Sequence, residues 1–191
     1  MKDSINSLQD NSICLETRTI FFFEEITSES MQRFIKNLHI LDNYKEGDIN
    51  IKMSSEGGCV ASGFAMYDAI KACESDVNIY GYSEIASMAT VVFQAGNKRI
   101  LMPNSYMLLH WGDQTISGHP KSNENWLKLY KDLDDRCNKI YLEKINNRQK
   151  EKKKKQIQVQ ELEKMLDFDT VILPKKVVSL GLADLILEDS Y

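Results

Sequence analysis

The sequence predicts an α/β fold in which βαβ units build a largely parallel sheet. Three observations support this fold class. Strand-like and helix-like segments alternate along most of the chain. The length of 191 residues suits one domain, and 42% apolar with 27% charged residues is typical of a globular protein rather than a disordered one.

The first part of the chain reads as regular strand–helix alternation. The first 16 residues are expected to form a loose polar arm, and residues 17–191 a single domain. β-Branched and aromatic residues mark the strands, and apolar residues at steps of three and four mark the helices. We expect strands over 17–26, 48–53 and 76–82, and helices over 28–42, 59–73 and 83–96, with a turn at the start of the last helix.

The pattern changes after two short strands that are expected over 98–103 and 105–110. A loop-like or edge-strand segment, "WGDQTISGHPKSN", precedes a long helix expected from about Asn123 to Arg148. The run "KEKKKK" (150–155) either interrupts or extends that helix; we interpret it as a solvated face, with binding of phosphate or of an acidic partner as the alternative. The end predicts a strand, a short helix that Pro174 opens and Gly181 stops, and a last strand.

Composition and charge narrow the function classes. The net charge of −4 argues against a nucleic-acid-binding protein, and no apolar run approaches the roughly 18 residues of a transmembrane helix, so no membrane association is expected. The polar start is unlike a secretion signal. The four cysteines show neither a C-x-x-C pair nor metal-ligand spacing, which favours reduced thiols and a cytoplasmic location.

Two strand-to-helix turns carry the candidate catalytic and anion-binding residues. Gly57 and Gly58 follow one strand, where their amides at a helix start could hold an anion; a simple tight turn is the alternative. Ser87 lies in the next such turn, followed by the amide of Met88. Because both turns open at the carboxyl ends of parallel strands, they should face one crevice and offer a nucleophile with amide donors for an oxyanion.

A serine nucleophile needs a general base, and His110 ends another predicted strand. A lone histidine after four apolar residues is also typical of a core or edge position. The third member should be a buried carboxylate that orients the imidazole. Spacing alone leaves Asp113, Asp167 and Asp169 as alternatives.

Four segments together resemble the proteolytic subunit of the Clp protease, the ClpP family. That family carries S-P-G-G, A-S-M-G, L-P-N-S-x-x-M-x-H and R-D-x-F/Y leading to Y-G-L-x-D; here they read "SEGG" (55–58), "ASMA" (86–89), "LMPNSYMLLH" (101–110) and "FDTV…LGLAD" (168–184). The resemblance covers about 17–187. It implies a ClpP/crotonase-like superhelix of repeated ββα units with a protruding handle helix at about 123–160.

The resemblance also implies residue roles. Ser87 matches the nucleophile, His110 the general base, Asp169 the orienting carboxylate, and Gly58 with Met88 the oxyanion-hole amides. The implied reaction is peptide-bond hydrolysis through an acyl-enzyme, with no metal and no other cofactor. Implied partners are further copies in stacked rings, an AAA+ unfoldase ATPase, and peptide or unfolded protein as substrate; the chain itself has no G-x-x-x-x-G-K-[ST] nucleotide loop.

Departures from the family pattern keep other hypotheses open. Glu56 replaces the proline of the glycine turn, and Phe168 replaces the arginine that helps to lock two rings together. A non-catalytic ring subunit is the first alternative. A crotonase-type acyl-CoA enzyme, which shares the superhelix and the paired amides, is the second.

Overall fold

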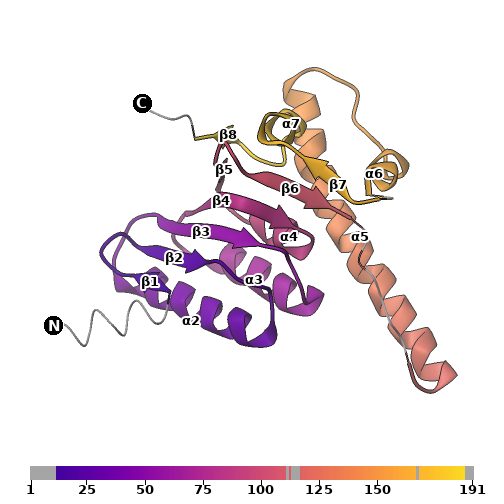
Figure 1. Cartoon of the computed structure of the whole chain (residues 1–191), viewed down its shortest axis with the longest axis horizontal. Helices are drawn as coiled ribbons and strands as arrows, with labels where there is room; N and C mark the ends of the chain where they lie inside the picture. Colours follow the sequence, from indigo (N-terminus) through magenta and orange to yellow (C-terminus); the bar gives the residue numbers. More distant parts are fainter. Residues whose placement is uncertain (1–11, 111, 113–116, 167, 188–191) are drawn as a thin grey trace.

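The computed structural model describes residues 12–110, 112, 117–166 and 168–187 (Figure 1). Its strands are β1 (Ile13–Cys14), β2 (Thr19–Phe22), β3 (Ile49–Ser55), β4 (Val77–Ala86), β5 (Lys98–Leu101), β6 (Tyr106–Leu109), β7 (Thr170–Ile172) and β8 (Leu185–Ile186). Its helices are α2 (Ser28–Tyr44), α3 (Val60–Ala72), α4 (Met88–Phe93), α5 (Pro120–Glu151), α6 (Val159–Leu166) and α7 (Pro174–Leu180). None of the described helices has the length and apolar character needed to cross a bilayer.

One sheet organises the described residues, and the prediction that it is largely parallel is confirmed. Strands β2, β3, β4, β5 and β8 pair side by side in parallel, with β1 antiparallel to β2 at one edge. β6 pairs in parallel with β4, and β7 pairs antiparallel with β6. The antiparallel β6–β7 pair brings the end of the chain back to its middle.

Strand β4 changes partner along its length. Residues 78–81 pair with β5, whereas residues 84–86 pair with β6, and Ser83 between them has a positive φ of 44°. The prediction of a strand ending at residue 82 and a helix beginning at 83 is therefore wrong. The strand continues because β6 supplies a second hydrogen-bonding partner, which a local pattern cannot reveal.

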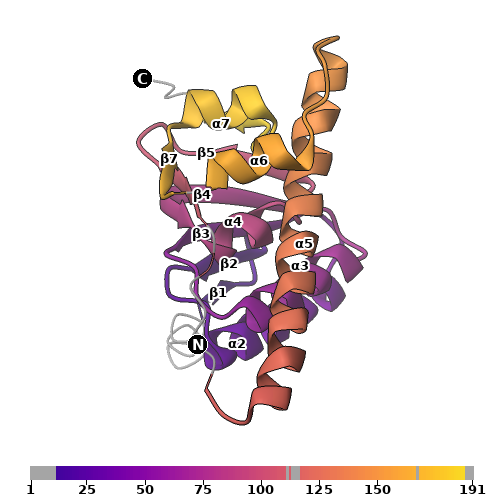
Figure 2. The same cartoon turned by 90° about the vertical axis from the view of Figure 1, so that its right-hand side faces the viewer.

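The core lies between one face of the sheet and the helices α2, α3 and α4, which cover that face (Figures 1 and 2). Strand β3 alternates as this requires, with Ile49, Ile51 and Met53 fully buried and the residues between them partly exposed. Helix α2 begins at a capping box in which Thr27 and Ser30 satisfy each other's backbone amides. The rigid sheet thus holds the carboxyl ends of β3, β4 and β6 next to one another.

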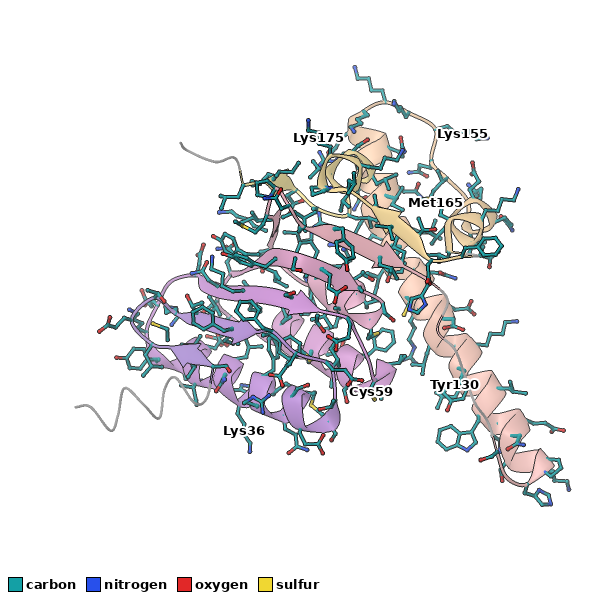
Figure 3. The ribbon with its side chains drawn as sticks, in the orientation of Figure 1. Lys36, Cys59, Tyr130, Lys155, Met165 and Lys175 are labelled. Atoms are coloured by element: carbon teal, nitrogen blue, oxygen red, sulfur yellow. The ribbon has the colours of Figure 1, made fainter. Side chains whose placement is uncertain are left out.

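Helix α5 runs past the sheet. At 1.5 Å per residue its 32 residues span roughly 48 Å. Only its second half is anchored in the core, through Asn138, Tyr141 and Ile145. Figure 3 shows Tyr130 on the half that extends beyond the sheet, where it stacks on Trp126, and Trp126 is 50% exposed.

Two predicted boundaries differ from the structure. Residues 13–14 are not part of a loose arm, because β1 pairs with β2; residues 1–11 lie outside the described part of the chain. The predicted handle of 123–160 is too long at its end, since α5 stops at Glu151 and α6 returns to the core through Leu162 and Leu166. The lysine run therefore interrupts the helix, with Lys153 in the left-handed region. Pro174 and Gly181 do bound the short helix α7, as predicted.

Candidate active site

Ser87 is placed at the sharp junction between β4 and α4. Its φ of 51° and ψ of −127° are unusual for a residue with a side chain. Such a conformation costs on the order of 1–3 kcal/mol and is concentrated at functional sites. The backbone amide of Ser87 donates to the carbonyl of Leu108 at 2.9 Å, which ties the turn to β6. A strand-to-helix turn of this kind exposes a nucleophilic hydroxyl at the edge of a sheet.

The glycine turn lies against this junction. A Cβ added to Gly57 would lie 2.7 Å from Ser87 Cβ and 2.9 Å from the Met88 nitrogen, and the φ of Gly57 is 99°. Only glycine fits there. The Gly57 amide donates to Ser55 Oγ at 3.1 Å, so of the two glycine amides considered from the sequence it is Gly58 that remains the candidate oxyanion donor.

The Met88 amide is the second candidate donor. Met88 is the first residue of α4, and the amides in a first helical turn have no partner within the helix. The short α4 therefore presents this amide at the same end of the sheet as the glycine turn.

His110 and Asp169 come together through strand register. Leu109 on β6 lies opposite Thr170 on β7, so the residues just beyond this pair, His110 and Asp169, face each other. His110 Nδ1 lies 3.6 Å from Asp169 Oδ1. Since Nδ1 faces the carboxylate, the other ring nitrogen, Nε2, is left for a different partner. Of the three acids that spacing left open, Asp113 and Asp167 lie outside the described residues.

The Asp169 side chain is 75% exposed in the single chain, which contradicts the expectation of a buried carboxylate. The distance of 3.6 Å also exceeds that of a hydrogen bond. The surrounding residues give the physical reason: Phe168, Val171 and Leu173 are 84%, 58% and 67% exposed. Asp169 thus lies on an uncovered apolar edge of the molecule, at the outer strand of the sheet.

Ser87 and His110 line one pocket. The other lining residues come from α3, α4, the segment after β6, α5 and α6: Val60, Met88, Val91, Gly112, Asp134, Cys137, Asn138, Tyr141 and Leu166. The serine turn and the histidine segment therefore share a single pocket, whereas Gly57 and Gly58 are not among its lining residues. In the described part of the chain no cluster of three or more His, Cys, Asp or Glu side chains is arranged to hold a metal ion.

Two residues that the sequence analysis did not assign to the site are connected to the Ser87 backbone by hydrogen bonds. Thr90 Oγ1 donates to the Ser87 carbonyl at 2.6 Å and lies 2.5 Å from the Tyr141 hydroxyl. Burial raises the pKa of Tyr141, so its hydroxyl keeps its proton and can donate it to Thr90. Tyr141 belongs to the predicted apolar stripe of the long helix, but that pattern does not reveal a partner on α4.

The charge in the pocket comes from α5. Burial, with Asp135 as the second cause, raises the pKa of the Asp134 carboxyl. Burial raises the pKa of Cys137 to about 12, with Asp134 adding to the effect, so this thiol is neutral at ordinary pH and is no rival nucleophile. Asn138 is 3% exposed, and its Oδ1 atom has no hydrogen-bond partner among the described residues.

Comparison with known proteins gives a consistent result. The Clp protease family model matches residues 4–190. The chain is 29% identical over 189 residues to the ATP-dependent Clp protease proteolytic subunit 3, chloroplastic, of Arabidopsis thaliana, covering 97% of this chain and 58% of the relative. It is 35% identical over 98 residues to the ATP-dependent Clp protease proteolytic subunit of Carsonella ruddii, covering 50% of each. The matched regions thus span 58% and 50% of the length of these two curated relatives.

The fold has a solved counterpart. A ClpP1 mutant from Listeria monocytogenes superposes with a TM-score of 0.79 at 22% identity, over 96% of this chain and 97% of that chain. The predicted ClpP-like α/β fold with its protruding helix is confirmed. With a family model that matches nearly its whole length, the chain belongs to the Clp protease family.

Proposed function

We propose that the chain is a serine-type endopeptidase, the proteolytic subunit of an ATP-dependent Clp-like protease. Ser87 Oγ attacks the carbonyl carbon of a peptide bond, and His110 Nε2 accepts its proton. The leaving amine takes that proton from His110. A water molecule then attacks the acyl-enzyme, His110 accepts a proton from the water, and the proton passes to Ser87 Oγ as the acid product leaves. The observation that carries the proposal is the strained strand-to-helix turn that presents Ser87 in the pocket that His110 also lines.

The amides of Gly58 and Met88 are proposed to stabilise the oxyanion. Two backbone donors at such a position typically contribute several kcal/mol to the transition state. The occupied Gly57 amide and the position of Met88 as the first residue of α4 support this pair. No metal and no cofactor enter the mechanism as proposed.

Asp169 is proposed to orient His110 through Nδ1. The register of β6 and β7 supports this role. Because Asp169 is exposed in the single chain, a neighbouring copy is needed to bury it. A neighbouring copy that covers the apolar edge at Phe168, Val171 and Leu173 would also exclude water from the carboxylate and strengthen its contact with the imidazole.

Self-association into stacked rings forms part of the proposal. The exposed side chains Trp126, Leu127 and Leu129 lie on the half of α5 that passes beyond the sheet, where they form an apolar surface that a partner helix can cover. A ring encloses its active sites, so folded substrates would need an AAA+ unfoldase ATPase, and peptides or unfolded proteins would be the substrates. We place this activity in the cytoplasm, because the cysteine pattern of the sequence favours a reducing compartment.

The test combines a fluorogenic peptide, a fluorophosphonate probe and the mass of the native assembly. Wild-type protein should cleave the peptide and be labelled at Ser87. Ser87→Ala should lose about 10⁴-fold in rate while keeping its fold and assembly, because one oxygen is removed from a tight turn. Activity retained within tenfold would refute the assignment.

The same experiment tests the first alternative, and a thermal-stability measurement with acyl-CoA tests the second. An assembled ring in which Ser87 is neither labelled nor active would identify a non-catalytic subunit, an outcome to which the long His110–Asp169 distance lends some support. Thermal stabilisation by acyl-CoA would instead indicate the crotonase-type reaction, whereas the peptidase predicts none.

A further inference from the structure

The pocket beside Ser87 has two chemically different walls. Val60, Met88, Val91 and Leu166 form an apolar side, whereas α5 contributes Asp134, Cys137, Asn138 and Tyr141. Because Ser87 and His110 line the same pocket, a peptide whose carbonyl lies at Ser87 must place the adjacent side chain there. This step rests on the proposed peptidase function. The polar wall then decides which side chain fits best.

The α5 wall carries two hydrogen-bond acceptors, the Asp134 carboxylate and the Asn138 amide oxygen. Asp134 and Asn138 are four residues apart and therefore lie on the same face of the helix. The Asn138 amide oxygen is buried and has no partner among the described residues, and a buried acceptor left in this state is costly. Of the described residues that line the pocket, none is Lys or Arg.

We propose that Asp134 and Asn138 make the pocket selective for a cationic side chain, Lys or Arg, on the acyl side of the cleaved bond. The ammonium or guanidinium group would donate to the Asp134 carboxylate and to Asn138 Oδ1, while its aliphatic stem packs on the apolar wall. The positive charge of such a cation favours the ionised carboxylate and so opposes the effect of burial, which raises the pKa of Asp134. The neutral Cys137 thiol between them adds no competing charge.

The experiment compares fluorogenic peptides that differ only in the residue before the cleaved bond: lysine, the uncharged isostere norleucine, and glutamate. Wild-type protein should show a kcat/KM for lysine about tenfold to a hundredfold above that for norleucine, as expected for one hydrogen bond to a charged group. Asp134→Asn should remove most of this ratio, because kcat/KM for the lysine peptide falls more than that for the norleucine peptide. Asp132→Asn, on an exposed position of the same helix outside the pocket, is the matched control and should change neither value.

Charge reversal and active-site labelling complete the test. Asp134→Lys should invert the preference toward glutamate, and the fluorophosphonate label on Ser87 normalises each variant for its content of assembled, active sites. Active protein that cleaves norleucine as well as lysine, or whose ratio survives Asp134→Asn, overturns this inference and leaves the peptidase assignment intact. Protein that is neither labelled nor cleaves any of the peptides overturns the proposed function, and this inference with it.

Discussion

The hydrogen bond between Tyr141 and Thr90 links the long helix to the nucleophile, and Tyr141→Phe tests it directly. The ring stays in place and only the hydroxyl is lost. Thr90 Oγ1, which is completely buried, then keeps its bond to the Ser87 carbonyl but loses the proton that Tyr141 donates. Leaving a buried acceptor unsatisfied costs about 1–2 kcal/mol of folding free energy. For a chain of this size the melting temperature should fall by about 2–8 °C.

The effect on activity follows from the strained conformation of Ser87. Its positive φ is held in part by the Thr90 contact, so a looser contact lets the turn relax away from the attacking geometry. We expect kcat to fall by about threefold to tenfold, equivalent to roughly 0.7–1.4 kcal/mol. KM should stay within twofold, because the ring of Tyr141 still lines the pocket. The rate of fluorophosphonate labelling should fall in step with kcat.

Two controls make this prediction specific. Tyr130→Phe removes a hydroxyl from the half of the same helix that extends beyond the sheet, outside the pocket lining, and should leave kcat, labelling and melting temperature unchanged. A double-mutant cycle with Thr90→Val should give a coupling energy of about 1 kcal/mol for the pair. A Tyr141→Phe protein with unchanged labelling rate and additive effects in the cycle would show that α5 does not position Ser87.

Three further predictions concern the turn, the carboxylate and the assembly. Gly57→Ala should abolish labelling of Ser87, because the added methyl would lie 2.7 Å from Ser87 Cβ; a variant labelled at the wild-type rate would contradict the geometry. Asp169→Asn should lower kcat by about 10⁴-fold, whereas Asp167→Asn should cost far less; the reverse result would move the carboxylate by two residues. Sedimentation at low and high salt should show the same assembly, because Phe168 and the exposed residues of α5 make its contacts apolar; a fully active monomer in both would disprove self-association.

Local sequence patterns were sufficient for most elements and for naming the candidate site residues, whose chemical roles stay predictions. β-Branched residues predicted β3, Pro174 and Gly181 predicted the ends of α7, and the two strand-to-helix turns indicated Gly58 and Ser87 as candidates. These features succeed because side-chain period, fixed proline φ and glycine freedom are properties of a few consecutive residues. The same patterns predicted, correctly, that the turns open at one edge of a parallel sheet.

Only the tertiary structure decided how distant segments meet. The partner change in β4 places Ser87 beside β6, and the register of β7 places Asp169 opposite His110. The crossing of α5 brings Tyr141 to Thr90 and sets Asp134 and Asn138 in the wall of the pocket. The tertiary structure also leaves Asp169 exposed in the single chain, whereas a buried carboxylate was expected for the residue that orients the imidazole. Strand pairing and helix packing depend on contacts between residues far apart in the chain. A pattern within one segment can therefore indicate a candidate residue, but it cannot show which distant residue lies next to it.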